Sequence, residues 1–422
     1  MIRANKPAVA VALAIGAGLL AASAIVMAQG TTFAKAERGR YLAEAGDCAA
    51  CHTADGGKPF AGGRAIPTPF GTLYSTNITP DKDTGIGRWS QTDFYKAMHD
   101  GIRRDGKHLY PAFPYPWYTK LDVDDVRAIK AYLDTVPAVK QENKPAKLPW
   151  PLSMRAVMSG WNGLFFHEGV FRADLQKPAQ WNRGAYLVEG LGHCGACHTP
   201  KSVLGGPKKD EHLEGGYGEH WYASSLTGDL RDGIGAWSAP EIVEYLKTGS
   251  NAKAAAAGPM AEVVKNSTQH LSEGDLNAIA AYLKDLPRTK DQSKNASTTT
   301  SKNIDNSVLN HGKALYVDNC TGCHMDNGAG IAQVFPPLKG SAPVQAKEPA
   351  TVLKAIIDGA SVVATKDKPT ALAMPAFGWK LSDREIADLA TYIRNAWGNH
   401  ASAVDADAVA DLRKQERRSA GG

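Results

Sequence analysis

The stretch from Cys194 to Pro200 reads CGACHTP, in which two cysteines are separated by two residues and a histidine directly follows the second. The same spacing recurs in CAACHTA from Cys48 and in CTGCHMD from Cys320. These copies use all 6 cysteines of the 422-residue chain, so the pattern organises the whole sequence. Because positions i and i+3 lie on one side of a helical turn, each copy gathers two thiols and an imidazole around one small volume.

This spacing predicts covalent attachment of a haem c group at each copy. The two cysteines form thioether bonds to the porphyrin, and the histidine ligates the iron from the proximal side. A structural zinc site needs four ligands, normally two cysteine pairs. Three cysteine pairs would fill one such site and leave one pair unused, so zinc does not explain the pattern. A redox dithiol needs no following histidine. A disulfide that closes so short a loop contributes little to stability. The predicted attachment residues are Cys48, Cys51, Cys194, Cys197, Cys320 and Cys323, and the predicted proximal ligands are His52, His198 and His324.

A longer repeat surrounds each copy. An amphipathic stretch precedes the cysteines, as in ERGRYLAEAGDCAACH and NRGAYLVEGLGHCGACH, and a helix with an aromatic residue on its apolar face closes the unit, as in DDVRAIKAYLDTV. Apolar residues spaced i, i+3, i+4 and i+7 favour helices at both ends. Gly39, Gly184 and Gly312 lie in the opening helices, where a missing side chain lets a second helix cross closely. The sequence therefore predicts a mainly α-helical protein of three tandem small bundles, each around one haem.

Composition divides the chain into seven segments. The linker is polar and rich in Ser and Thr, which is typical of a flexible connection. The connector after domain 1 is dense in aromatic residues, which indicates burial against the neighbouring domains, our preferred interpretation, or against a partner protein. The predicted segments are a signal peptide at 1–28, domain 1 at 31–136, the connector at 137–180, domain 2 at 181–288, the linker at 289–305, domain 3 at 306–400 and a polar C-terminal tail at 401–422.

The distal ligand of each iron decides its chemistry. A histidine–methionine iron is closed to substrates, whereas an open iron binds oxygen or peroxide. Met374 lies in ALAMPAFGW just before the last closing helix, and Met260 is the only methionine of its domain. We expect these two residues to be the distal ligands of domains 3 and 2.

Domain 1 departs from this pattern. Counted from the tryptophan that both domains share, the position of the domain 2 methionine is held by Phe113, which cannot ligate iron. Met98 is the preferred distal ligand there, since it is the only methionine of the domain. His108 and His99 are alternatives, and so is an open site.

The first residues indicate export. Arg3 and Lys6 precede an apolar run from Ala8 to Met27, with small-residue cleavage sites ending at Ala24 and Ala28. Retention of the run as a membrane anchor is the alternative. We expect the working part of the chain to lie in a bacterial-type periplasm, at the outer face of the cytoplasmic membrane. The formal charge of +5 is spread along the chain and gives no support to nucleic-acid binding.

Longer motifs resemble one known family, the three-haem cytochrome c subunits of bacterial membrane-bound dehydrogenases that oxidise alcohols, sugars or sugar acids outside the cytoplasm. The resemblance rests on NITPDKDTGIGRWS, HLYPAFPY, RGAYLVEGLGHCGACHTP and MPAFGWKLSDREIADLATYIRNAWGN, together with the three C-x-x-C-H copies in order. It implies class I cytochrome c domains, with the proximal and distal ligands given above. Many members carry methionine in a YPAMPY motif, so Phe113 is a departure that leaves the first distal ligand open.

The resemblance also implies partners. Electrons come from a catalytic subunit that carries flavin or a quinone cofactor, with a molybdenum hydroxylase as the alternative, and they pass to ubiquinone or a terminal oxidase. The sequence shows no dinucleotide-binding, serine-hydrolase or zinc-protease motif, so we expect an electron-transfer subunit and not an enzyme on its own. The competing hypotheses are a haem peroxidase with an open first site and a soluble shuttle without a fixed partner.

Overall fold

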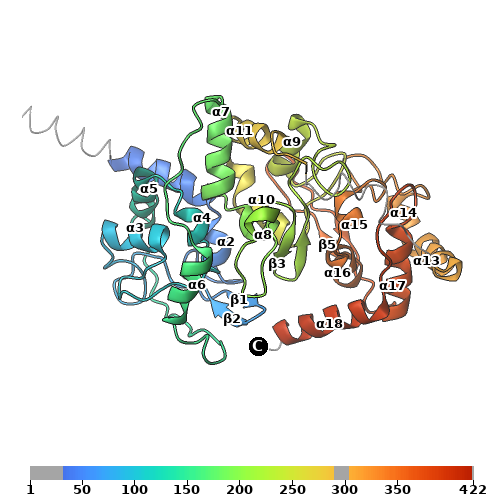
Figure 1. The fold of residues 1–422 in the computed structure, drawn as a ribbon, viewed down its shortest axis with the longest axis horizontal. Helices are drawn as coiled ribbons and strands as arrows, with labels where there is room; N and C mark the ends of the chain where they lie inside the picture. The colour runs from blue at the N-terminus through green and yellow to red at the C-terminus, as the bar shows by residue number, and fades with distance from the viewer. Residues whose placement is uncertain (1–31, 289–303, 421–422) are drawn as a thin grey trace, which may run out of the picture.

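The computed structural model describes residues 32–288 and 304–420. The predicted signal peptide and most of the predicted linker lie outside these ranges. The described chain is mainly helical and contains short two-stranded antiparallel sheets, in agreement with the predicted fold class. Figure 1 shows the repeats side by side along the long axis, with domain 1 at the left, domain 2 in the middle and domain 3 at the right.

Domain 1 opens with a helix over residues 32–45. Ser90 and Asp93 form a capping box at the start of α3, and Gly101 ends that helix with φ at 65°. The further elements are α2 (Cys48–His52), the hairpin of β1 (Ala65–Thr68) and β2 (Gly71–Tyr74), α3 (Gln91–Asp100), α4 (Tyr115–Tyr118) and α5 (Val123–Leu133).

Domain 2 repeats this order after a connector that contains α6 (Val157–Phe165). Its opening helix α7 continues into a π-helical turn, η1, so the approach to the second cysteine pair differs from that to the first. The elements are α7 (Ala179–Tyr186), η1 (Leu187–Leu191), α8 (Gly195–His198), η2 (Lys209–Glu211), β3 (Gly216–Gly218), β4 (Trp221–Ala223), α9 (Ala239–Thr248), α10 (Pro259–Asn266), η3 (Thr268–His270) and α11 (Glu273–Lys284).

Domain 3 has the same opening and closing helices and a shorter hairpin. The predicted polar tail contains helix α18, which packs along α17 and buries Val409 and Leu412. These two apolar side chains dock one face of an otherwise polar segment. The elements are α13 (Asn306–Asn319), α14 (Thr321–His324), α15 (Ala342–Gln345), α16 (Ala350–Asp358), β5 (Ala360–Ser361), β6 (Ala373–Met374), α17 (Asp383–Ile393) and α18 (Ala406–Ala420).

The opening and closing helices of each domain cross at a glycine. A β-carbon added at Gly39 would lie 1.8 Å from the carbonyl oxygen of Ala128 on α5. The matching distances to a carbonyl oxygen are 1.9 Å for Gly184, under α11, and 2.2 Å for Gly312, under α17. A carbon atom cannot approach an oxygen so closely, so each crossing requires a residue without a side chain. The predicted close crossing is confirmed in all three domains.

Domains 1 and 2 contact each other through two matching sets of hydrogen bonds. Tyr41 of domain 1 donates to Asp275 of domain 2 over 2.6 Å, and Tyr186 of domain 2 donates to Asp125 of domain 1 over 2.7 Å. Such reciprocity is the mark of an interface with two-fold symmetry. One hydrophobic core runs through both domains. Each aspartate also accepts from an arginine on the opening helix of its own domain, namely Arg38 and Arg183.

Domain 3 has a hydrophobic core of its own and contacts domain 2 differently. Thr351 on α16 accepts a hydrogen bond from the backbone nitrogen of Tyr222 on β4 over 3.1 Å and donates one to its carbonyl oxygen over 2.7 Å. A small apolar cluster of Ala256, Val264 and Val363 lies at the same boundary. Figure 1 shows α16 beside the domain 2 hairpin.

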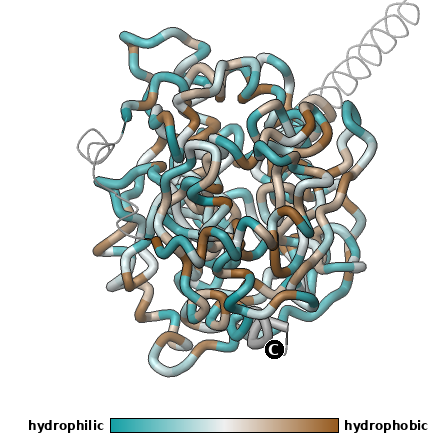
Figure 2. Tube along the Cα trace, turned by 90° about the vertical axis from the view of Figure 1, so that its right-hand side faces the viewer, coloured by the Kyte–Doolittle hydropathy of each residue, from teal (hydrophilic) through white to brown (hydrophobic). Residues whose placement is uncertain are grey.

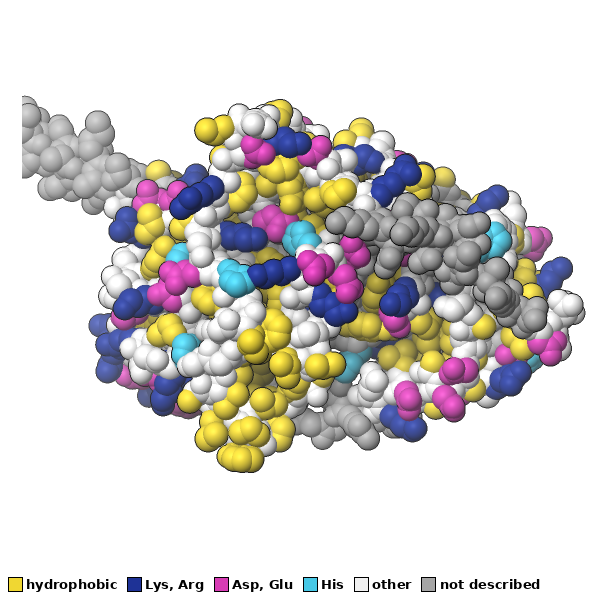
Figure 3. Space-filling view, in the orientation of Figure 1, with side chains coloured by type: hydrophobic (Ala, Val, Ile, Leu, Met, Phe, Trp, Pro, Cys, Tyr) yellow, Lys and Arg dark blue, Asp and Glu magenta, His cyan; other side chains and the backbone are white. Residues whose placement is uncertain are grey.

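The connector is only partly covered. Trp161 donates to the carbonyl oxygen of Leu204 over 3.0 Å, and Phe165 lies against Gly206, so domain 2 covers one side of α6. Trp150 and Leu164 are 79% and 64% exposed. Figure 3 shows apolar side chains gathered at this end of the molecule. Internal packing therefore accounts for part of the apolar connector and leaves these two side chains uncovered.

The helices follow the hydropathy of the chain. Figure 2 shows hydrophobic and hydrophilic residues alternating along the trace, as expected for helices that each bury one face. Within the described ranges, every helix is too short or too polar to cross a lipid bilayer.

Candidate functional site

Each C-x-x-C-H copy forms a short helix just after the opening helix of its domain: α2, α8 and α14. All six cysteines are unpaired, and the second cysteine of each copy is exposed. Burial raises the pKa of Cys48 and Cys194 to about 12 and that of Cys320 to about 11. The chain therefore presents unpaired cysteines in pairs, one helical turn apart.

The three predicted proximal histidines share one hydrogen-bond geometry. Nδ1 lies 2.6 Å from a carbonyl oxygen in His52, 2.7 Å in His198 and 3.0 Å in His324. Donation from Nδ1 fixes the tautomer in which Nε2 carries the free lone pair. Burial lowers the pKa of all three imidazoles, which favours the neutral form that ligates metals. The acceptors are the carbonyl groups of Thr76, Ser224 and Pro336.

These observations fit a covalently attached haem at each copy. Unpaired thiols one turn apart match the two thioether positions, and an imidazole whose outer nitrogen is anchored presents the other nitrogen to iron. The structure thus brings together, in each domain, the cysteines and the histidine that the sequence groups.

The predicted distal methionines of domains 2 and 3 lie on the segment before each closing helix. Met260 is in the first turn of α10, partly buried beside Val264 and Val363. Met374 is on β6, partly buried against the core of domain 3. Both come from elements other than those that carry the histidines, and their ligation of iron stays a prediction.

The candidates in domain 1 lie in different surroundings. Met98 is 5% exposed and lies on α3 in the core that domains 1 and 2 share. His108 is engaged by the connector, since its Nε2 lies 2.8 Å from Ser159 Oγ. His99 is also buried, and its Nδ1 lies 2.7 Å from Asp100. The Nε2 atom of His99 has no hydrogen-bond partner, so His99 as well as Met98 offers an atom that can ligate iron without first losing a hydrogen bond.

Aromatic side chains occupy the position in domain 1 that matches Met260. Phe113 packs edge-on against Tyr118, with ring centroids 5.5 Å apart. Tyr118 donates to the carbonyl oxygen of Gly46 over 3.0 Å, just before the first cysteine pair. The role of Tyr118 cannot be recognised from the sequence, because a tyrosine in an aromatic-rich stretch gives no sign of the loop that it reaches.

The attachment helices of domains 1 and 2 are each covered by the other domain. α10 contacts α2, and Ser267 at the end of α10 donates to the carbonyl oxygen of Ala45 over 3.1 Å. In the opposite direction, a β-carbon at Gly195 on α8 would lie 2.7 Å from Nε1 of Trp117 on α4. The first two candidate haem sites therefore lie at one shared interface.

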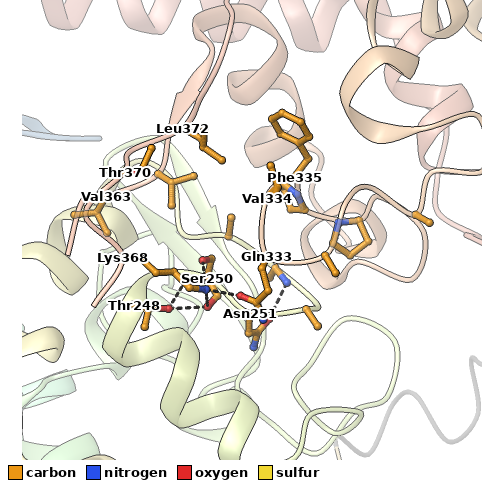
Figure 4. Close-up of a pocket in the computed structure, with 18 residues that line it drawn as sticks. Thr248, Ser250, Asn251, Gln333, Val334, Phe335, Val363, Lys368, Thr370 and Leu372 are labelled. Carbon is orange, nitrogen blue, oxygen red and sulfur yellow. Dashed lines mark hydrogen bonds between the residues drawn. The ribbon is translucent and has the colours of Figure 1, made fainter. Parts of the chain in front are cut away.

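A cavity lies at the boundary between domains 2 and 3, and Figure 4 shows residues of both domains in its wall. Lys368 reaches across it and donates to Ser250 Oγ over 3.0 Å and to Gln333 Oε1 over 2.5 Å. Pro336, whose carbonyl oxygen anchors His324, also lines the cavity. The cavity therefore borders the proximal side of the third candidate site.

Comparisons with known proteins show what the chain is similar to. The cytochrome c family model matches residues 36–137 and 309–397. The chain is 43% identical to the cytochrome c subunit of gluconate 2-dehydrogenase from Pantoea cypripedii, over 96% of this chain and 95% of that protein. It is 40% identical to the cytochrome c subunit of alcohol dehydrogenase (quinone) from Gluconobacter oxydans, over 95% of this chain and 87% of that one. A dihaem c-type cytochrome from Cereibacter sphaeroides is 39% identical, over 60% of this chain and 86% of its own length.

Proposed function

The chain belongs to the cytochrome c subunits of dehydrogenase complexes, and from this premise we propose that it relays electrons from a periplasmic dehydrogenase to the quinone pool or a terminal oxidase. Membership indicates covalently bound haem c and a catalytic dehydrogenase subunit as partner. The chain is thus an electron-transfer component, and substrate oxidation belongs to that partner.

Three haem c groups are held, one at each C-x-x-C-H helix. The observation that carries this proposal is the geometry repeated at His52, His198 and His324, in which a carbonyl group anchors Nδ1 and leaves Nε2 for iron. A bound haem c supplies one-electron oxidation and reduction. The cysteine pairs fix its position, and the anchored imidazole keeps its orientation in both redox states.

The distal side decides between a relay and an enzyme. Met260, Met374 and, in domain 1, Met98 close the irons to outside ligands. The packing of Phe113 on Tyr118 supports a closed first site, because these rings fill the place where the other domains carry methionine. The relatives give the peroxidase alternative no support.

The partner carries a flavin or quinone cofactor and oxidises an alcohol, a sugar or a sugar acid. Two relatives support this choice of substrates, since one is named for gluconate 2-dehydrogenase and the other for alcohol dehydrogenase (quinone). A molybdenum hydroxylase is the alternative partner. The apolar run near the N-terminus supports export to the periplasm and a place at the outer face of the cytoplasmic membrane.

Intact-mass measurement of the exported protein, combined with carbon monoxide difference spectra, tests the proposal. We expect the mass of three haems added to the chain and no carbon monoxide complex under native conditions. Fewer than three haems would overturn the assignment of three sites. If one haem bound carbon monoxide and the protein turned over peroxide, the protein would be a peroxidase and the proposed electron relay would be wrong. Co-purification of the chain from native membranes, followed by cofactor analysis, identifies the partner class.

A further inference from the structure

Arg64 lies between the first two candidate haem sites and contacts both. It directly precedes β1, and its side chain is 20% exposed. One guanidinium nitrogen donates to the carbonyl oxygen of Ala50 over 2.8 Å, inside the helix that carries the first cysteine pair. The same side chain pairs with two carboxylates of domain 2, Glu262 over 2.7 Å and Glu219 over 3.2 Å.

Both carboxylates belong to the second site. Glu219 directly follows β3, where a β-carbon at Gly218 would lie 2.9 Å from Sγ of Cys197. Glu262 lies on α10, two residues after Met260. One arginine of domain 1 therefore holds a charge near the thioether edge of the second site and another on the helix that carries its predicted distal ligand.

The charges of domain 2 also act on the first site. Arg64 donates to the carbonyl oxygen of Ala50, which lies between the two cysteines of the first pair. Glu219 and Glu262 pair with the same guanidinium group, so their charges lie one side chain away from the thioether edge of the first site. The cluster of Arg64, Glu219 and Glu262 thus lies within electrostatic reach of both sites.

We propose that Arg64 is a positioning residue that couples the first two haems, because it offsets two carboxylates at their shared edge and raises both reduction potentials together. The inference rests on the proposed function, since it requires haem at both sites. Reduction removes one positive charge from a haem, so a nearby cation favours the reduced form and uncompensated carboxylates favour the oxidised form. The hydrogen bond and ion pairs of Arg64 described above join domain 1 to domain 2, so the expected effect falls on the first two haems.

The test is an absorbance-monitored redox titration of the full-length, haem-loaded protein. In Arg64→Gln we expect two of the three midpoint potentials to fall, with the ratio of oxidised to reduced haem at a fixed potential rising about threefold to tenfold, the scale of one charge near a partly buried site. Glu262→Gln should move the same two potentials upward. Arg64→Lys keeps the charge and should restore most of the change.

Arg127→Gln is the matched control, since Arg127 pairs with Asp124 on an exposed turn of α5. Three attached haems with unmoved potentials in Arg64→Gln and Glu262→Gln would overturn this inference alone. Equal shifts at all three haems would overturn it too, as would an Arg64→Lys protein that behaves like Arg64→Gln. Fewer than three haems on the unaltered chain would instead remove the proposed function.

Discussion

The boundary between domains 1 and 2 and the boundary between domains 2 and 3 are built on different principles. At the first, a tyrosine of each domain bonds an aspartate of the other, and one hydrophobic core continues across. At the second, Thr351 bonds the backbone of Tyr222, and domain 3 keeps a core of its own, joined to domain 2 by the small cluster of Ala256, Val264 and Val363. The same repeated fold therefore forms one joint body from two copies and adds the third as a separate unit.

The difference bears on electron transfer. Where the core is shared, each attachment helix is covered by the neighbouring domain, so the first two sites hold a fixed relation to each other. The third site lies across a boundary that includes a cavity. Loss of structure in domain 1 should therefore damage the second site, whereas loss of domain 3 should leave the first two intact.

The largest expected effect tests this directly. Gly184→Ala places a carbon 1.9 Å from a carbonyl oxygen, so we expect destabilisation of about 3 kcal/mol or more, with loss of haem from domains 1 and 2 together. Gly312→Ala should cost domain 3 its haem and spare the other two. Haem stoichiometry and thermal unfolding measure both. Gly160→Ala on α6 is the control, because a β-carbon there meets no atom within 4 Å. Loss of all three haems in Gly312→Ala would contradict the separation of domain 3.

The next largest effect is a dependence of stability on pH that comes from Glu189 of domain 2. Its carboxylate forms an ion pair with Lys120 of domain 1 over 3.3 Å. Burial acts to raise its pKa, but hydrogen bonds and charge from His212, the charge of Lys120 and a hydrogen bond from Tyr282 outweigh burial and lower it to about 2 from 4.5. The folded-state pKa lies below the unfolded value, so this stabilisation is present above pH 4.5 and is lost as the pH falls towards 2.

We therefore expect Glu189→Gln to lower the free energy of unfolding at neutral pH by on the order of 2–3 kcal/mol. Its difference from the unaltered protein should vanish between pH 4.5 and 2. Denaturant titrations at stepped pH measure both quantities. Glu273 lies at an exposed first-turn position of α11 and serves as the control. The free energy of unfolding of Glu273→Gln should follow that of the unaltered protein at every pH. A gap that persists below pH 2 would rule out this linkage.

The reciprocal tyrosines give a smaller effect. Tyr41→Phe and Tyr186→Phe each remove a hydrogen bond to a carboxylate and the acceptor of a backbone N–H, that of Ser272 and of Asp122 respectively. We expect each substitution to cost about 1–2 kcal/mol. If the two sets of bonds are coupled, the loss of unfolding free energy in the double variant differs from the sum of the two single losses, and a double-mutant cycle measures that difference. Strict additivity would mean that the two halves of the interface act independently.

The smallest effect is expected at the other boundary. Thr351→Val keeps the shape of the side chain and removes the donor and the acceptor that face Tyr222, so it should cost domain 3 about 1 kcal/mol and leave domains 1 and 2 unchanged. Separate unfolding transitions for the third haem and for the first two, followed by haem absorbance, provide the measurement. If the unfolding transition of the first two haems also shifted, domain 3 would contribute to the stability of domains 1 and 2.

The sequence predicted what depends on residues close together in the chain. The cysteine and histidine groups lie within five residues of each other, and Gly39, Gly184 and Gly312 could be recognised because each falls at the same place in a repeated helix. The position of α18 was not predictable in this way. Its two buried side chains, Val409 and Leu412, carry too little apolar signal to mark a docked face.

Contacts between distant residues could not be predicted. Tyr41 and Asp275 are 234 positions apart, and although Tyr41 lies in the repeated stretch before the first cysteine pair, no local pattern joins it to Asp275. Arg64 stands among glycines, and its carboxylate partners lie 155 and 198 positions further along. The exposed Trp150 shows the converse failure, since aromatic content alone predicted burial that the tertiary structure does not provide.

The reciprocal contact also has a consequence for assembly. Because each domain finds its match on the other, the interface does not distinguish a neighbour in the same polypeptide from the equivalent domain of a second molecule. The connector at 137–180 merely keeps the local concentration of the correct neighbour high. At high protein concentration, or with that connector shortened, we expect two molecules to exchange domains and form an intertwined dimer with every cross-domain bond preserved.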